Sequence, residues 1–223
     1  APRRQAARDL RSFAAMSARE RSESPASTGH DRHMRSEAEI EPLRSAVPRP
    51  RGRLGERSPD AALAAVAARQ FGVVSRRQAI AAGFTRHGIQ HALSRGRLHL
   101  LHRGVYAVGH PGIAEAGRWM AAVLAGGVRA VLSHRSAAAL WRMRRDGAGI
   151  AEITVPGSRG PRAGLVLHRG RLADDEISMA EGIPVTAPAR TLLDLAAVIP
   201  AQALRLAAAE AEVLRLADAS SLA

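Results

Sequence analysis

The 223-residue chain contains no cysteine and no lysine, and no apolar run long enough to cross a bilayer without a break. The absence of cysteine excludes disulfides and thiolate metal sites, which fits a reducing, cytoplasmic environment. The longest apolar run, 119–132, is interrupted by Arg129 and two glycines. No stretch near the N-terminus resembles the apolar core of a signal peptide.

Because lysine is absent, all 33 basic residues are arginine, and a phosphate-binding loop that ends in Lys is excluded. Abundant arginine, alanine and glycine are typical of a GC-rich coding genome, so part of the arginine excess reflects codon usage. The net charge of +13 must therefore be judged by its distribution. Residues 61–110 contain seven arginines and no acidic residue, whereas residues 171–223 contain four arginines and eight acids. A basic centre favours a nucleic-acid partner, and an acidic C-terminal part is disfavoured near phosphate.

The first sixty residues mix Arg, Ser, Pro and Glu with few large apolar residues and no steady period. This composition predicts a disordered tail over 1–60. An arginine-rich arm that folds on nucleic acid is an alternative, although interspersed glutamates dilute its charge. A further alternative is that translation starts at Met34 or later, in which case much of the tail is not part of the protein.

The stretch from Ser75 to Gly109 predicts helix, tight turn, second helix and basic hairpin. Ser75 and Gln78 form a capping-box pattern that starts a helix at about 76–82, and Gly83 stops it. Thr85 caps a second helix that ends before Gly96, and residues 97–108 form two short apolar segments around a basic tip. With a first helix capped by Asp60, this order predicts a winged helix-turn-helix over 61–110.

The second helix of this unit has one apolar face, with Ile89, Ala92 and Leu93, and one polar, basic face that suits a major groove. In this interpretation Gln90 reads adenine, Arg86 reads guanine, and the hairpin meets phosphates or the minor groove. The predicted DNA-binding residues are Arg76, Arg77, Thr85, Arg86, His87, Gln90, His91, Ser94, Arg95, Arg97, His99, His102 and Arg103. Solvated residues on a small helical domain, or an RNA-binding face, are the alternatives.

Residues 111–223 predict a second, α+β domain. Its expected elements are helices at 114–125 and from Ser133, alternating strands in AEITVP and GLVLHRG, a helix capped by Thr186, and a last helix at 201–216. The run Ser133 to Ser136 invites a catalytic interpretation, but a capping serine and a polar rim are favoured because neighbouring residues point in different directions. No catalytic, metal or cofactor site is expected. The carboxylates of Asp174, Asp175 and Glu176 are expected to be solvated.

Several blocks, in order, resemble the AbiEi family of antitoxins from type IV abortive-infection toxin-antitoxin systems, in an actinobacterial form. They are the segment from Ser75 to Pro111, LSHRSAAALWRM, ITVP, LVLHRG and GIPVTAPARTLLDLA, and the resemblance covers about 61–216. It implies an N-terminal winged helix-turn-helix on operator DNA, with inverted repeats at its own promoter. It also implies a C-terminal domain that counteracts a nucleotidyltransferase toxin without direct contact, and no membrane partner.

The resemblance leaves two functions open. One is a DNA-binding autorepressor with no chemistry of its own. The other is the DNA-targeting part of a longer protein, because related chains carry a further C-terminal domain like the very-short-patch-repair endonucleases. This sequence stops soon after Leu216, where such a domain would begin, so we expect a short form or a fragment.

We predict that residues 1 to about 58 are dispensable for folding, because they have too little apolar content to offset the entropy of ordering them. A chain that begins at Ser58 should keep the thermal midpoint of the full chain, measured by circular dichroism. Loss of soluble, cooperatively unfolding protein would show that the tail docks on the core.

Overall fold

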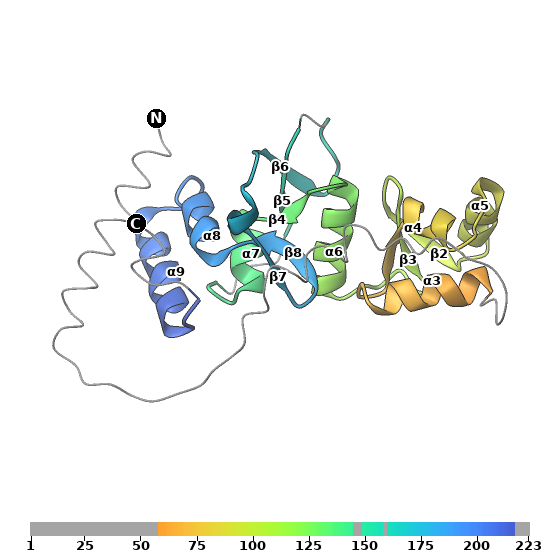
Figure 1. Ribbon diagram of the computed structural model, residues 1–223, viewed down its shortest axis with the longest axis horizontal. Helices are drawn as coiled ribbons and strands as arrows, with labels where there is room; N and C mark the ends of the chain where they lie inside the picture. The colour runs from red at the N-terminus through yellow and green to blue at the C-terminus, as the bar shows by residue number, and fades with distance from the viewer. Residues whose placement is uncertain (1–57, 145–148, 158–159, 217–223) are drawn as a thin grey trace.

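The computed structural model describes residues 58–144, 149–157 and 160–216 (Figure 1). The predicted tail lies outside these residues except for its last three positions. Helices and strands alternate without a regular βαβ order, which confirms the predicted α+β class. Of the helices in the described residues, none combines the length and apolar character needed to cross a membrane.

The N-terminal part of the described chain is a three-stranded antiparallel sheet with three helices packed on it. The sheet order is β1-β3-β2, with β3 paired to both neighbours. Its elements are α3 (Pro59–Ala68), β1 (Val73–Ser75), α4 (Arg76–Ala81), α5 (Arg86–Ser94), β2 (Leu98–His102) and β3 (Val105–Val108). The predicted pair of short helices and the hairpin are confirmed. Strand β1 was not predicted, because a segment of three residues is recognisable as a strand only through its pairing with β3.

Local hydrogen bonds explain where the helices begin. The Ser75 hydroxyl accepts from the Gln78 N–H while the Gln78 side chain accepts from the Ser75 N–H, so the predicted capping box is confirmed. Thr85 caps α5 by accepting from the Gly88 N–H, also as predicted. The prediction that Asp60 caps the first helix was wrong. Ser58 is the N-cap, because Pro59 suits the first helical position.

The core of this part contains Leu63, Val74, Ile89 and Tyr106, all buried, so Tyr106 of β3 is a packed strand aromatic. Leu100 is 63% exposed, although the sequence placed it among the apolar hairpin positions. The register of β2 against β3 shifts between Leu100 and His102, which breaks the inside-outside alternation. Leu101 packs inward instead.

The remaining described residues form a mixed five-stranded sheet with helices around it. The strand order is β6-β5-β4-β8-β7. The elements are α6 (Glu115–Gly126), β4 (Val131–Leu132), α7 (His134–Leu140), β5 (Ala151–Val155), β6 (Leu165–Arg169), the 3-10 turn η3 (Asp174–Glu176), β7 (Ile177–Ala180), β8 (Ile183–Thr186), α8 (Pro188–Leu195) and α9 (Ala201–Val213).

Strand β5 differs from the prediction of an alternating strand. Every side chain of β5 is buried, including Glu152 and Thr154, because the strand has sheet neighbours on both sides and helices over its faces. The β5–β6 pair is parallel, so the connection between Val155 and Leu165 returns along the length of the strand. The predicted Thr186 cap of α8 was also wrong. Thr186 ends β8, and Ala187 takes the N-cap position before Pro188.

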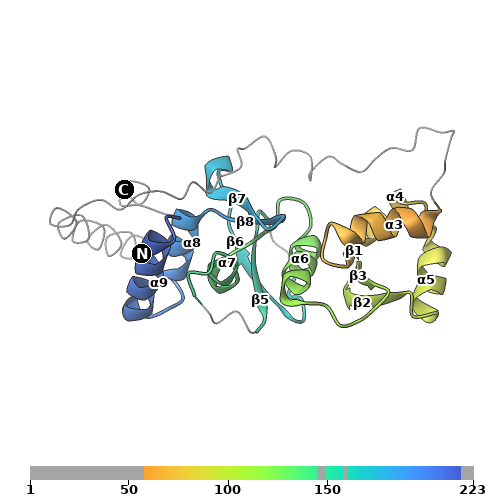
Figure 2. The same cartoon turned by 90° about the horizontal axis from the view of Figure 1, so that it is seen from below.

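Helix α6 lies between the two sheets in both views (Figures 1 and 2) and contacts strands of each. One buried cluster joins Val73 and Val105 of the first sheet to Trp119 and Met120 of α6 and to Ile153 of the second. The two parts therefore share apolar core, and the predicted boundary at residue 110 stays a prediction. Helices α7, α8 and α9 enclose a second apolar cluster beyond the five-stranded sheet.

Gly117 allows the close approach of α6 to the first sheet, since a Cβ there would lie 2.9 Å from the Phe71 carbonyl oxygen. We predict that Gly117→Val lowers the free energy of unfolding by about 1–3 kcal/mol, because the backbone has to move. Gly149→Val is the control, since a Cβ there meets nothing within 4 Å. Equal stability of the two variants in urea unfolding would contradict this tight contact.

Candidate nucleic-acid interface

Helix α5 presents the two faces that its sequence spacing predicts. Ile89 and Ala92 are buried, whereas the polar face is open to solvent. The exposed residues of this face are Arg86, His87, Gln90, His91 and Ser94. The Ser94 hydroxyl donates to the His91 carbonyl, so it is engaged within the helix. The remaining side chains extend from a rigid helical surface.

The turn between α4 and α5 fixes how α5 projects. Gly83 has φ +102°, a conformation that favours glycine, and it directs the chain out of α4. The Phe84 N–H donates to the Ala79 carbonyl, and the Phe84 side chain is buried in the core below. Thr85 then begins α5 at once, so the two helices cannot lie alongside each other.

The hairpin turn is joined to the start of α4. The Arg76 N–H donates to the Gly104 carbonyl at 2.7 Å, which places Arg103 close to Arg76 and Arg77 in space. All three arginine side chains belong to exposed residues. The structure therefore brings together basic residues that are more than 25 positions apart in sequence.

Arg97 is the member of the predicted set that has an acidic partner among the described residues. Its guanidinium lies 2.9 Å from the Asp60 carboxylate, and both side chains are about half exposed. An exposed pair of this kind is worth about 0–1 kcal/mol, so phosphate can displace it. Asp60 nevertheless lowers the positive potential at this point of the surface.

Two predicted histidines are less available than the arginines. His99 is half-buried, and its Nε2 atom is buried without a hydrogen-bond partner in the described residues. His102 is also half-buried, and desolvation together with the nearby Arg162 lowers its pKa. Both effects favour the neutral form of the His102 ring.

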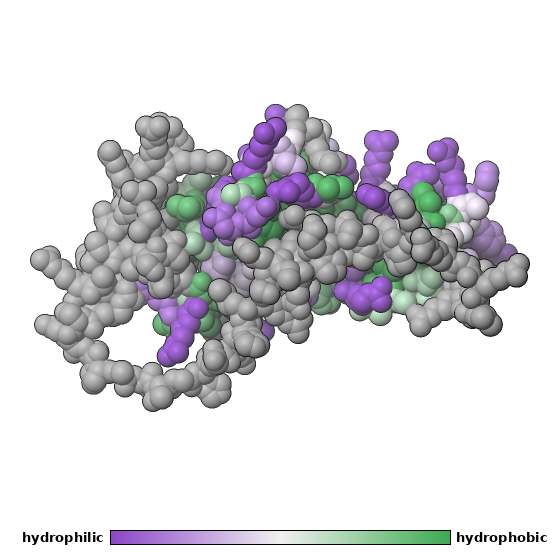
Figure 3. Space-filling model, viewed as in Figure 1, coloured by the Kyte–Doolittle hydropathy of each residue, from purple (hydrophilic) through white to green (hydrophobic). Residues whose placement is uncertain are grey.

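Arg162 is a neighbour of this surface that sequence reasoning missed. A Cβ at Gly164 would lie 3.7 Å from His102 Cε1, so the β5–β6 connection runs beside the hairpin. Figure 3 shows hydrophilic side chains along the same upper edge, over the β6 region and over the hairpin and α5. The parallel pairing of β5 and β6 brings Arg162 and Gly164 to the hairpin, and sequence spacing did not predict that pairing.

The Ser133 to Ser136 segment does not form the polar rim that was predicted. Ser133, His134 and Ser136 are buried, and Ser133 occupies the N-cap position without a capping hydrogen bond from its side chain. Its Oγ lies 3.0 Å from His134 Nδ1, so the expectation that these neighbours point apart was wrong. Since Ser133 has no exposed surface, a substrate cannot reach its hydroxyl in this arrangement.

Glu152 of β5 joins this buried segment to β6. Its carboxylate lies 3.0 Å from the Arg135 guanidinium and 2.7 Å from His168 Nε2. Burial on its own raises the pKa of Glu152, but the His168 hydrogen bond and Arg135 outweigh burial and lower it. The His168 ring stacks on the His134 ring with centroids 3.4 Å apart. These residues form a polar cluster around the buried Glu152 and His134, and sequence spacing did not predict it.

The acidic run Asp174–Glu176 was expected to be solvated, and two of its carboxylates also pair with arginines. Asp174 lies 3.1 Å from Arg129, and Glu176 is bonded to Arg190. Arg190 also bonds the buried Asp194, and although burial opposes it, these carboxylates raise the Arg190 pKa. Glu176 therefore holds α8 near η3, whereas Asp174 and Asp175 are exposed to solvent as expected.

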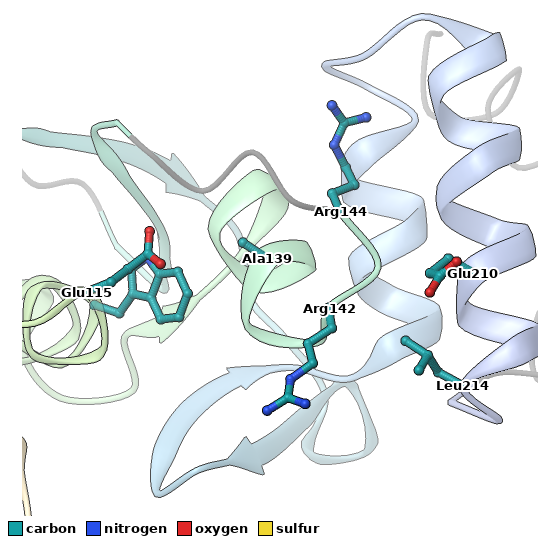
Figure 4. A pocket seen from close by; sticks show the side chains of 7 residues that line it. Glu115, Ala139, Arg142, Arg144, Glu210 and Leu214 are labelled. Atoms are coloured by element: carbon teal, nitrogen blue, oxygen red, sulfur yellow. The ribbon is translucent and has the colours of Figure 1, made fainter.

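An open pocket lies where α6, α7 and α9 meet (Figure 4). Its lining residues are Glu115, Trp119, Ala139, Arg142, Arg144, Glu210 and Leu214. The side chains of Arg142 and Arg144 point in different directions, so their charges do not converge on one ligand position. Arg142 also lies 3.7 Å from Glu181. This geometry does not define a binding site.

A comparison with protein families assigns a class to the segment that carries the candidate interface. Residues 61–109 match the family model described as transcriptional regulator, AbiEi antitoxin. Over this segment the chain is AbiEi-like, which confirms the family resemblance for residues 61–109, and the resemblance beyond residue 109 stays a prediction. The match spans less than a quarter of the 223 residues, and the actinobacterial form stays a prediction. No curated protein matches the chain.

The Arg97–Asp60 pair provides a test of the interface. We predict that Asp60→Asn raises DNA affinity by up to about fivefold, because an exposed pair of about 1 kcal/mol no longer competes with phosphate. The salt slope of binding should grow by about one unit. Fluorescence anisotropy at several salt concentrations measures both quantities. Asp175→Asn, at an exposed carboxylate on η3, is the control, and equal binding by the two variants would place Arg97 outside the interface.

Proposed function

We propose that this protein is a DNA-binding transcriptional regulator whose helix α5 enters the major groove of its own promoter. The observation that carries the proposal is the exposed polar face of α5, set in a segment, 61–110, that has seven arginines and no acidic residue. The order helix, strand, helix, helix and hairpin supports a winged helix-turn-helix, in which the second helix of the α4–α5 pair reads bases. The AbiEi match over the same residues supports transcriptional regulation.

The exposed side chains divide into two roles. Gln90 has the amide geometry for adenine and Arg86 the guanidinium for guanine, so these two are the proposed base readers. Arg76, Arg77 and Arg103 lie around the joined hairpin and α4, where they suit phosphates on either side of the groove. Thr85, His87, His91, Ser94, Arg95 and Arg97 complete the proposed surface, while the half-buried His99 and His102 support it from within.

Charge separation along the molecule agrees with this orientation. Helices α8 and α9 lie at the end of the described chain opposite α5 (Figure 1). They belong to the segment 171–223, which has eight acids and four arginines. A duplex on α5 therefore lies far from α8 and α9, which together carry three carboxylates and two arginines.

The regulator proposed here is an autorepressor of a type IV toxin-antitoxin system that binds inverted repeats in its own promoter. Its functional partner is a nucleotidyltransferase toxin that it does not contact directly. The same DNA-binding surface also serves the alternative, a targeting part of a longer nuclease-like protein. A neighbouring nucleotidyltransferase gene supports the first, and a reading frame that continues into a nuclease core supports the second.

Base readers and phosphate contacts should fail differently when changed to alanine. We predict that Gln90→Ala loses about 1–3 kcal/mol of discrimination for the promoter and leaves non-specific binding nearly unchanged. Arg103→Ala and Arg162→Ala should weaken promoter and scrambled DNA alike and reduce the salt slope by about one unit each. The measurement is a salt titration of binding to both DNAs.

Arg205→Ala is the matched control, because Arg205 is an exposed arginine on α9 at the opposite end of the described chain. It should bind both DNAs as the parent does. If Gln90→Ala and Arg103→Ala also bind both DNAs as the parent does, α5 and the hairpin do not form the DNA-reading surface. If DNA binding changes only in Arg162→Ala, the DNA-binding surface lies at the β5–β6 connection instead.

A further inference from the structure

Three potential metal ligands meet inside the C-terminal part of the described chain. They are His134 at the start of α7, Glu152 on β5 and His168 on β6. One ligand atom from each lies within 4.8 Å of the other two. His134 and Glu152 are each 4% exposed, so this cluster is not a solvated surface group. The proposed DNA-binding function uses none of the three residues.

The backbone holds these side chains in place from three neighbouring elements. Glu152 and His168 stand on adjacent parallel strands, with Glu152 opposite Val166 and Thr154 opposite His168. Their side chains are diagonal neighbours on one face of the sheet. Helix α7 is pinned to β5 by two hydrogen bonds, from the Ser133 N–H to the Glu152 carbonyl and from the Glu152 N–H to the Ser136 hydroxyl.

Ion pairing alone does not account for the composition of the cluster. Arg135 lies 3.0 Å from Glu152 and already neutralises its charge, and it also donates to the Val198 carbonyl. Two further imidazoles stack against each other beside this pair, with their planes 12° apart. His134 moreover has φ +52°, an unfavourable backbone conformation for a non-glycine residue. Strain of this kind at a buried polar group is typical of binding sites.

We propose that His134, Glu152 and His168 bind one divalent transition-metal ion, with zinc as the preferred ion. Two imidazole nitrogens and one carboxylate oxygen form a donor set that suits zinc, and a water molecule completes the tetrahedron. The Ser133 hydroxyl contacts His134 Nδ1, a contact that orients a ligating ring through its other nitrogen. Arg135 holds the second oxygen of Glu152 in the same supporting way.

Metal binding exchanges one set of bonds for another. The His168 Nε2–Glu152 hydrogen bond is replaced by bonds from these two groups to the ion, and His168 then binds as the neutral ring with its hydrogen on Nδ1. The stacked rings turn so that both lone pairs point at the ion. The bound ion ties α7 to β5 and β6, so its effect is to stabilise the C-terminal part rather than to contact DNA.

The test uses the full chain after removal of metals with a chelator. Isothermal titration with Zn²⁺ should show one saturable site per chain, and saturating Zn²⁺ should raise the thermal midpoint. Substitution with Co²⁺ should give the visible absorption of a tetrahedral site. Replacing one ligand, in His168→Ala or Glu152→Gln, should weaken Zn²⁺ affinity by more than about tenfold.

The control is the double change of His87 and His91 to alanine, because these exposed histidines lie one turn apart on α5 and can bind Zn²⁺ adventitiously. The control should keep the site and its affinity. If circular dichroism shows that His168→Ala does not fold, the Zn²⁺ affinity of the near-isosteric Glu152→Gln tests the site instead. No saturable site in the parent, or a site lost in the α5 control and kept in Glu152→Gln, would overturn the proposal.

Discussion

The packing of α6 between two sheets is the constraint on which the rest of the described structure depends. Its small residues let it approach both sides. A Cβ at Gly117 would meet the Phe71 carbonyl, and one at Gly126 would lie 2.7 Å from the Ile153 side chain. Because one apolar cluster runs through this helix, the hairpin and the five-stranded sheet keep a fixed relation. That relation is what places Arg162 beside His102.

Two sets of arginines in the described residues differ in their acidic partners. In the C-terminal part, Arg129, Arg135 and Arg190 bond carboxylates and hold elements of the fold together. On α4, α5 and the hairpin tip, the arginines have no acidic partner within the described ranges, and the nearby Arg97 has one. A coding bias toward arginine raises both groups alike. The unpaired group is therefore the one whose charge remains available to a nucleic acid.

The two candidate sites of this chain differ in their chemistry and in their relation to solvent. The surface around α5 is built from exposed cationic and amide groups, which suit a large anionic partner that brings its own water and counterions. In the cluster of His134, Glu152 and His168, the first two residues are buried and His168 is half-buried, and the three side chains come from three different elements. In a DNA-binding regulator with such a metal site, the N-terminal part would recognise DNA and the metal site would stabilise the C-terminal part.

The sequence by itself determined the local elements at the N-terminal part. Helix ends here are fixed by hydrogen bonds and backbone angles that involve only a few neighbouring residues, namely Ser75 with Gln78, Thr85, Gly83 and Gly96. The helix pair, the hairpin and the polar face of α5 were therefore predictable. Tertiary structure decided what depends on distant pairing. The three-residue strand β1 forms only because it pairs with β3. The parallel register of β5 and β6 brings His168 to Glu152. Ser133 and His134 are buried because α7 packs on β5. Contacts between residues that are far apart in the chain leave no periodic pattern in any one segment, which is why composition and spacing alone could not reveal them.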